Sequence, residues 1–98
     1  IRHRVENFDR WKPRYDAHGT VRKQAGCKTE QLFRSQDDPS DLFILFEWDK
    51  IENARKFTQS QELRETMINA GVIGMPKFTF LEQVERKVTR QAPEKKVA

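Results

Sequence analysis

The two histidines of this chain, His3 and His18, are the side chains best suited to proton transfer, because an imidazole titrates near neutral pH. His18 follows Trp11 and Tyr15 at helical spacing, and Arg22 continues it, so these side chains are expected on one helix face. In a short N-terminal strand, His3 lies two positions from apolar residues on either side, so it is expected on the same face as they are. Both histidines are therefore predicted to point into a space between helix and sheet. There His18 would act as a base that takes a proton from a phenolic hydroxyl group, and His3 would help to bind the ligand.

The other candidate residues would bind the rest of such a molecule. Arg22 or Arg34 would stabilise the anion that remains after the proton is lost, and Arg34 is the predicted partner of the catalytic histidine. The rings of the ligand would stack on Trp11, Tyr15 and Trp48. A pocket with aromatic walls and a few convergent polar groups is what a small aromatic ligand requires.

Each of these residues also fits a purely structural role. A single histidine on an apolar helix face is often a satisfied residue of the core or its rim. Trp11 and Tyr15, four positions apart, are typical of helix-to-sheet packing. Arg34 would pair with the acidic turn that follows it, and Trp48 would simply close an apolar strand. The residue types alone do not decide between the two interpretations.

These side chains need a scaffold, and the hydrophobic pattern predicts one with the order β-α-β-β-α-β. The strand-like segments cover residues 1–6, 27–35, 42–48 and 77–85. The first helix would be capped by Asn7 or Asp9 and stopped by Gly26. Pro13 would lie about one turn from its start. This order is that of a ferredoxin-like α+β domain, with a four-stranded antiparallel sheet and helices on one side.

The second helical region is predicted to have two parts. Asp49 would cap the first part, with Glu52 completing a capping box. Ser60 would start the second part, and Gly71 would end it. The side chains expected to face the core are Ile51, Ala54, Phe57, Leu63, Met67 and Ala70.

The strand at 42–48 predicts a second copy of the chain, because both of its faces are apolar. One face carries Leu42, Ile44, Phe46 and Trp48, and the other carries Phe43 and Leu45. Two helical regions can cover only one side of the sheet. The other side would expose an apolar patch that contains Phe33, Phe43, Leu45 and Leu81. Such a patch is larger than usual for a soluble monomer, so the sheets of two copies are expected to pair in a homodimer.

Length and charge suggest one neutral domain with a basic end. Residues 1–85 are the predicted domain and carry 14 Lys/Arg and 14 Asp/Glu. The net charge of +4 therefore comes from 86–98, a predicted basic polar tail. A neutral domain argues against a nucleic-acid partner. The single Cys27 and the lack of an apolar run of about 18 residues favour a cytoplasmic protein without a membrane partner.

Several other chemistries are disfavoured by the motifs. Two isolated histidines and one cysteine do not have the spacing of a zinc site. The sequence contains no glycine-rich phosphate loop and no nucleophile elbow, so no metal and no cofactor are expected. RNA-binding domains share the predicted order of elements. Their third strand, however, carries glycine and a basic residue that DLFILFEW lacks.

A family resemblance adds to this interpretation. The stretches that carry it are RHRVENFDRWKPRYDAH, AGCKTEQLFRSQDDPSDLFILFEWD, ARKF, SQELRETMINAGV and FTFLEQVE. They resemble the small dimeric α+β-barrel proteins of the antibiotic-biosynthesis-monooxygenase-like or cyclase-like group, over residues 1–85. The resemblance implies sheets paired into a barrel and a ligand held between sheet and helices.

For function, the resemblance implies a cofactor-independent monooxygenase, an oxidoreductase, or a related isomerase or cyclase. The substrate would be an aromatic or quinol-like metabolite. A non-catalytic ligand-binding or structural dimer of the same fold remains the alternative. Haem-degrading members of the group use Asn, Trp and His. Asn7 matches the first, but residues 50–70 contain neither of the others, which disfavours haem degradation.

Overall fold

In the computed structural model, which describes residues 1–89, short strands alternate with pairs of helices. The elements in chain order are β1 (Arg2–Val5), α1 (Phe8–Ala17), α2 (Gly19–Ala25), β2 (Cys27–Arg34), β3 (Asp41–Trp48), α3 (Ile51–Thr58), α4 (Gln61–Asn69) and β4 (Val72–Lys77). The sheet order is β2-β3-β1-β4, and all neighbouring strands are antiparallel. The predicted ferredoxin-like α+β fold is therefore confirmed.

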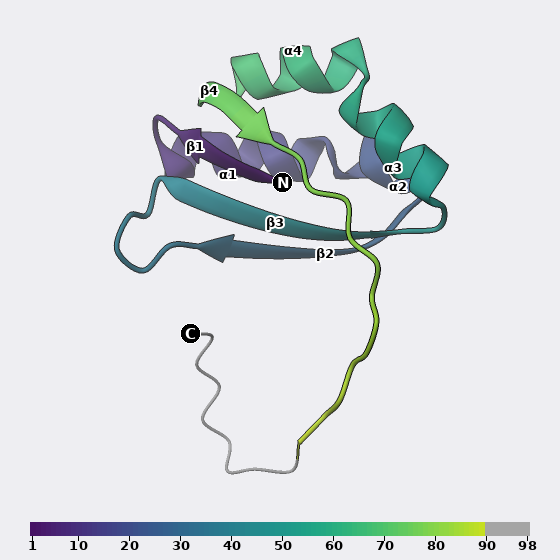
Figure 1. Cartoon of the computed structure of the whole chain (residues 1–98). Helices are drawn as coiled ribbons and strands as arrows, with labels where there is room; N and C mark the ends of the chain where they lie inside the picture. Colours follow the sequence, from purple (N-terminus) through teal and green to yellow (C-terminus); the bar gives the residue numbers. More distant parts are fainter. Residues whose placement is uncertain (90–98) are drawn as a thin grey trace.

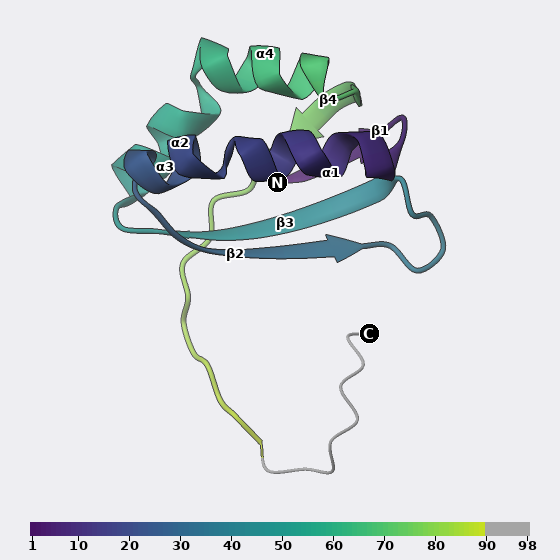
Figure 2. The same ribbon diagram turned by 180° about the vertical axis from the view of Figure 1, so that it is seen from behind.

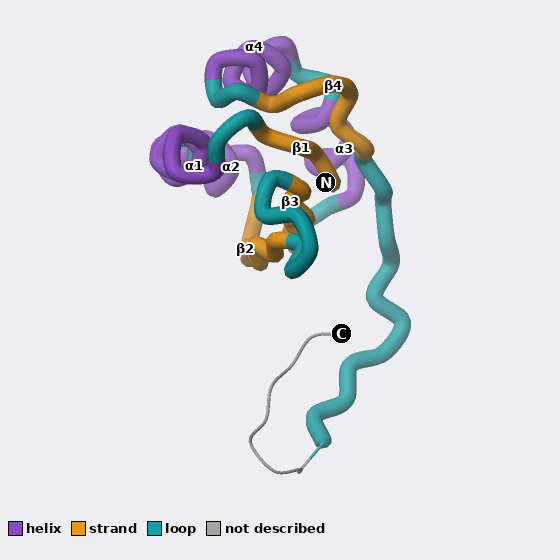
Figure 3. Tube along the Cα trace, turned by 90° about the vertical axis from the view of Figure 1, so that its left-hand side faces the viewer, coloured by secondary structure: helices purple, strands orange, loops and turns teal. Residues whose placement is uncertain are grey.

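The helices lie on one side of the sheet, as the two opposite views show (Figures 1 and 2). The core forms between the two layers. Its fully buried members are Val5, Trp11, Leu42, Ile44 and Ala70. Seen along the strands, the chain after β4 leaves on the side away from α1 and α2 (Figure 3). Among the described residues, no helix is both long and apolar enough to cross a bilayer.

Short-range interactions determine where the helices that connect β1 to β2 begin and end. The side chain of Asn7 caps α1 by accepting a hydrogen bond from the Arg10 N–H (3.0 Å). Gly26 ends α2 with φ of 115°, a left-handed conformation that glycine adopts without strain. Pro13 lies further inside α1 than expected. Its ring costs one helical hydrogen bond, to the carbonyl of Asp9, and this loss is confined to the exposed start of the helix.

In the helices that connect β3 to β4, one predicted helix cap is wrong. Lys50, not Asp49, is the N-cap of α3, and its side chain makes no capping hydrogen bond. The first helical hydrogen bond runs from the Ala54 N–H to the Lys50 carbonyl (3.3 Å), and the Asp49 N–H donates to the Gly26 carbonyl (3.0 Å). Ile51 is 46% exposed and does not join the buried stripe. Ser60 caps α4 as predicted, accepting a hydrogen bond from the Leu63 N–H (3.1 Å).

The last strand also differs from the prediction. β4 comprises Val72–Lys77, and the segment 78–85, expected to be strand, has no strand structure. The pairing of β4 with β1 ends where Lys77 lies opposite Arg2. Beyond that point the segment has no neighbouring strand within the described chain, so its alternating pattern is not used for pairing. Of the predicted basic tail at 86–98, residues 90–98 lie outside the described range.

Candidate active site

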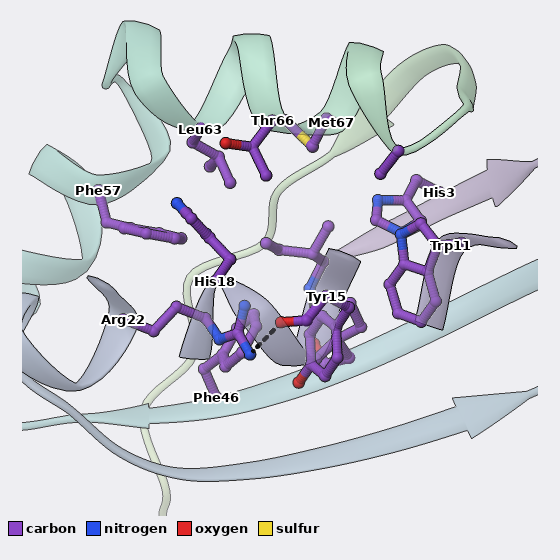
Figure 4. Close-up of a pocket in the computed structure, with 13 residues that line it drawn as sticks. His3, Trp11, Tyr15, His18, Arg22, Phe46, Phe57, Leu63, Thr66 and Met67 are labelled. Carbon is purple, nitrogen blue, oxygen red and sulfur yellow. Dashed lines mark hydrogen bonds between the residues drawn. The ribbon is translucent and has the colours of Figure 1, made fainter. Parts of the chain in front are cut away.

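A small cavity lies between the helices and the sheet, where the sequence predicted a ligand site (Figure 4). One side, called the wall, is formed by Trp11, Tyr15, His18 and Arg22 of the α1–α2 crossover. The opposite side, called the roof, is formed by Leu63, Thr66 and Met67 of α4. Strands β1 and β3 form the floor, which includes His3 and Phe46. The cavity volume is about 40 Å³, enough for about three water molecules.

His3 is buried in the floor of this cavity, with only 6% of its surface exposed. Its ring meets the edge of Trp11, with 5.6 Å between the ring centroids. Neither ring nitrogen has a hydrogen-bond partner among the described residues. Burial, helped by the nearby N-terminal charge, lowers the pKa of His3 to about 4. The ring is therefore neutral at pH 7, with two unused polar atoms.

His18 stands at the junction of α1 and α2. Its N–H donates to the Arg14 carbonyl (3.1 Å), and its carbonyl accepts from the Arg22 N–H (3.2 Å), so the backbone orients the ring. The side chain is buried, and Nε2 has no hydrogen-bond partner within the described chain. Its nearest acidic atom, Oε1 of Glu62, is 3.7 Å away, which is too long for a hydrogen bond. Burial, together with the Arg22 charge, lowers the pKa of His18 below its usual value.

Arg22 is the most tightly held charged residue of the wall, at 3% exposure. Its Nε and Nη2 atoms donate to both carboxylate oxygens of Glu30 (2.7 and 3.2 Å). Nη2 also donates to the Tyr15 carbonyl (2.8 Å), and the guanidinium lies 4.0 Å from the centre of the Tyr15 ring. The Tyr15 hydroxyl donates to Glu30 as well (2.8 Å). Burial and this hydrogen bond raise the pKa of Tyr15 above its ordinary range. Arg22 is thus a neutralised charge that stiffens the wall.

Glu30 is the functional residue that the sequence analysis missed. The signal for it was present, because the alternation of β2 places Glu30 on the same face as Leu32, which contacts the core. A carboxylate at that position is expected to have a cation nearby, and Arg22 was already predicted to lie on the facing helix surface. The roof residues were also missed as site residues, although Leu63 and Met67 were predicted to point inward.

Two predicted site residues do not reach the cavity. The Arg34 guanidinium packs over the Phe8 ring at 4.5 Å, and neither it nor Trp48 lines the cavity. The acidic turn that Arg34 was expected to meet is used by Arg4, which pairs with Asp38. Trp48 packs behind the lining, with its ring centroid 5.1 Å from that of Phe57. The structure therefore brings together His3, Trp11, Tyr15, His18 and Arg22.

Other nucleophiles and metal ligands are poorly placed in the described range. Burial raises the pKa of Cys27 to about 11, so its thiol is protonated at neutral pH. No group of three or more His, Cys, Asp or Glu side chains in residues 1–89 is arranged to hold a metal ion. The reactive groups that the described chain offers at this cavity are the two imidazoles.

Neither a protein-family model nor a curated protein sequence matches this chain. Among solved structures, the chain is similar to the crystal structure of a "putative antibiotic biosynthesis monooxygenase" from Bordetella bronchiseptica. The TM-score is 0.70 at 18% sequence identity, and the match covers 86% of this chain and 92% of that one. At such low identity, the structural match is evidence of a shared fold. The chain therefore shares the α+β fold of that protein, and the resemblance seen in its sequence is confirmed as a resemblance of fold.

Proposed function

We propose that this protein is a cofactor-independent monooxygenase that acts on a small quinol-like aromatic compound in a reducing, cytoplasmic setting. The observation that carries the proposal is that two buried, neutral imidazoles share one aromatic cavity, where both nitrogens of His3 and Nε2 of His18 lack partners among the described residues. Buried polar atoms are nearly always satisfied, so water would fill these positions in the free protein and a ligand with hydrogen-bonding groups could replace it. The similar fold of the Bordetella protein supports the same class of reaction.

In this proposal His18 is the base. With its own proton on Nδ1, Nε2 accepts the proton of the substrate hydroxyl, and the electron pair of the broken O–H bond stays on oxygen. Arg22 supports the resulting anion through Nη1, which makes no hydrogen bond within the described chain. The electron-rich anion reacts with dioxygen, the co-substrate. One oxygen atom enters the ring and the other leaves as water, so a quinol and dioxygen give a hydroxyquinone and water.

The test is oxygen consumption with a single-ring hydroquinone, comparing wild type with His18→Ala. Loss of the base is expected to reduce the rate by about 100-fold or more. Arg14→Ala is the matched control, because Arg14 lies on the same helix and its side chain is exposed. Equal rates for wild type and His18→Ala would remove His18 from the mechanism, and no consumption by the wild type would end the oxygenase proposal.

A second candidate is a binding module without turnover, which needs room for the ring but not for dioxygen beside it. At about 40 Å³ the space is smaller than the cavity of about 150 Å³ that binds benzene in an engineered protein. A protein that only binds such compounds would be stabilised by them in a thermal melt without consuming oxygen. Hydroquinone and phenol would raise its Tm to a similar extent. A shift in Tm accompanied by oxygen uptake would instead favour the enzyme.

For assembly, we propose a homodimer that pairs the open faces of two sheets. Phe33 and Phe43 are partners in the β2–β3 register and are 36% and 39% exposed on the face away from the helices, with Leu45 at 47%. Sheets that are apolar on both faces are normally covered on both. Sedimentation at micromolar concentration should show a dimer for wild type and a monomer for Phe43→Lys. Ile68→Lys, on the exposed surface of α4, is the control. A wild-type monomer would contradict the proposal.

A further inference from the structure

The roof of the cavity comes from a single helix, and that helix also brings an acidic side chain to the wall. Leu63, Thr66 and Met67 of α4 close the cavity above His18, as the close-up shows (Figure 4). Glu62 belongs to the first turn of the same helix, beside these residues. Its Oε1 lies 3.7 Å from Nε2 of His18, which is the unpartnered nitrogen of the wall.

Among residues 1–89, Glu62 is the acidic neighbour of His18 whose carboxylate accepts no hydrogen bond. From α2, Arg22 faces the imidazole, and its positive charge disfavours a second one. Glu30 could offset that effect, but its carboxylate already accepts hydrogen bonds from Arg22 and Tyr15. From α3 the neighbour is the apolar Phe57, whose ring centroid is 6.1 Å from that of His18. The N-terminal amine on the β1 side donates to the Ile44 carbonyl.

We infer that Glu62 is the acceptor for the His18 imidazolium: once Nε2 has taken up a proton, its N–H donates to the Glu62 carboxylate. This inference rests on the proposed function only for the source of the proton. A protonated Nε2 becomes a donor, and a gap of 3.7 Å closes to hydrogen-bond length with a small rotation of an exposed glutamate.

The experiment follows the titration of His18 by NMR in wild type and in Glu62→Gln. Removal of a nearby anion makes the imidazolium less favourable, so the pKa of His18 should fall in the variant. The pair is partly exposed, so the expected fall is about 0.3–0.7 pH units. Glu65→Gln is the matched control, with the same change of charge on the same helix, and it should leave the pKa of His18 unchanged. Glu62→Asp, which keeps the charge on a shorter side chain, should give an intermediate value.

The result separates this inference from the proposed function. A fall in Glu62→Gln alone supports the pairing, whether or not quinols are oxidised, because the titration needs no substrate. Equal pKa values in wild type and Glu62→Gln would overturn it, and so would an equal fall in Glu65→Gln. If wild type does oxidise quinols, the acidic limb of its pH–rate profile should move down in Glu62→Gln by the same amount as the pKa of His18.

Discussion

The wall and the roof of the cavity face each other but are held in different ways. The wall is fixed by hydrogen bonds, because Arg22 ties α2 to Glu30 on β2 and to the backbone of α1. The roof packs on the cavity through apolar side chains such as Leu63, and Glu62 reaches His18 only at 3.7 Å. The side that would do chemistry is therefore cross-linked by hydrogen bonds, while the roof is held mainly by apolar packing.

The largest effect is expected from breaking the wall. Glu30→Ala leaves the buried Arg22 charge without its carboxylate, which should reduce the free energy of unfolding by about 3 kcal/mol. This value is at the low end for a buried pair because Glu30 is 30% exposed. Urea denaturation measures it, with Glu47→Ala on the neighbouring strand as the control. A loss equal to that of the control would show that the wall does not depend on this pair.

A pH dependence of stability, of similar size, is expected from His3 in the floor of the cavity. The pKa of His3 is about 4 in the folded protein and about 6.5 in the unfolded chain, so the unfolded chain takes up the proton first as the pH falls. Stability should therefore drop by about 3 kcal/mol between pH 6.5 and pH 4 on account of His3. In His3→Phe this part of the dependence should be absent. Stability curves of the two proteins that run parallel with pH would contradict the assignment.

The smallest effect on stability is expected at the N-terminus of α4, the helix that forms the roof. Ser60→Ala removes the acceptor for the Leu63 N–H and should cost about 1 kcal/mol. Hydrogen exchange should then become faster in α4, while exchange in α1 and α2 stays at the wild-type rate. Equal acceleration in all three helices would mean that the roof opens only with the whole domain, and the contrast between wall and roof would be lost.

The sequence predicts the fold well because its local signals agree with its tertiary contacts. Asn7, Gly26, Ser60 and Gly71 mark helix ends through backbone chemistry that acts within a few residues. The helix face from Trp11 to Arg22 was also predictable, since helical spacing alone places those side chains together.

The remaining features depend on contacts distant in sequence. The Asp49 N–H, which the predicted capping box would use, is bonded instead to Gly26, more than 20 residues away. The strand predicted at 77–85 does not continue past Lys77 because β1 offers no pairing partner beyond Arg2. The pattern within the segment does not reveal where its neighbour ends. Arg34 was assigned to the site by its type, whereas the twist and register of β2 place it over Phe8. The pairing of Glu30 with Arg22 requires knowing which strand lies under α2.

The cavity volume of about 40 Å³ affects the affinity that the protein can have for an aromatic ring. If a ring enters only when α4 has moved aside, the observed dissociation constant is the intrinsic one divided by the fraction of molecules in that open state. If about one molecule in a hundred is open, the ligand binds about a hundredfold more weakly than its final contacts would allow. The equilibrium of one short helix would then set the concentration at which this protein responds.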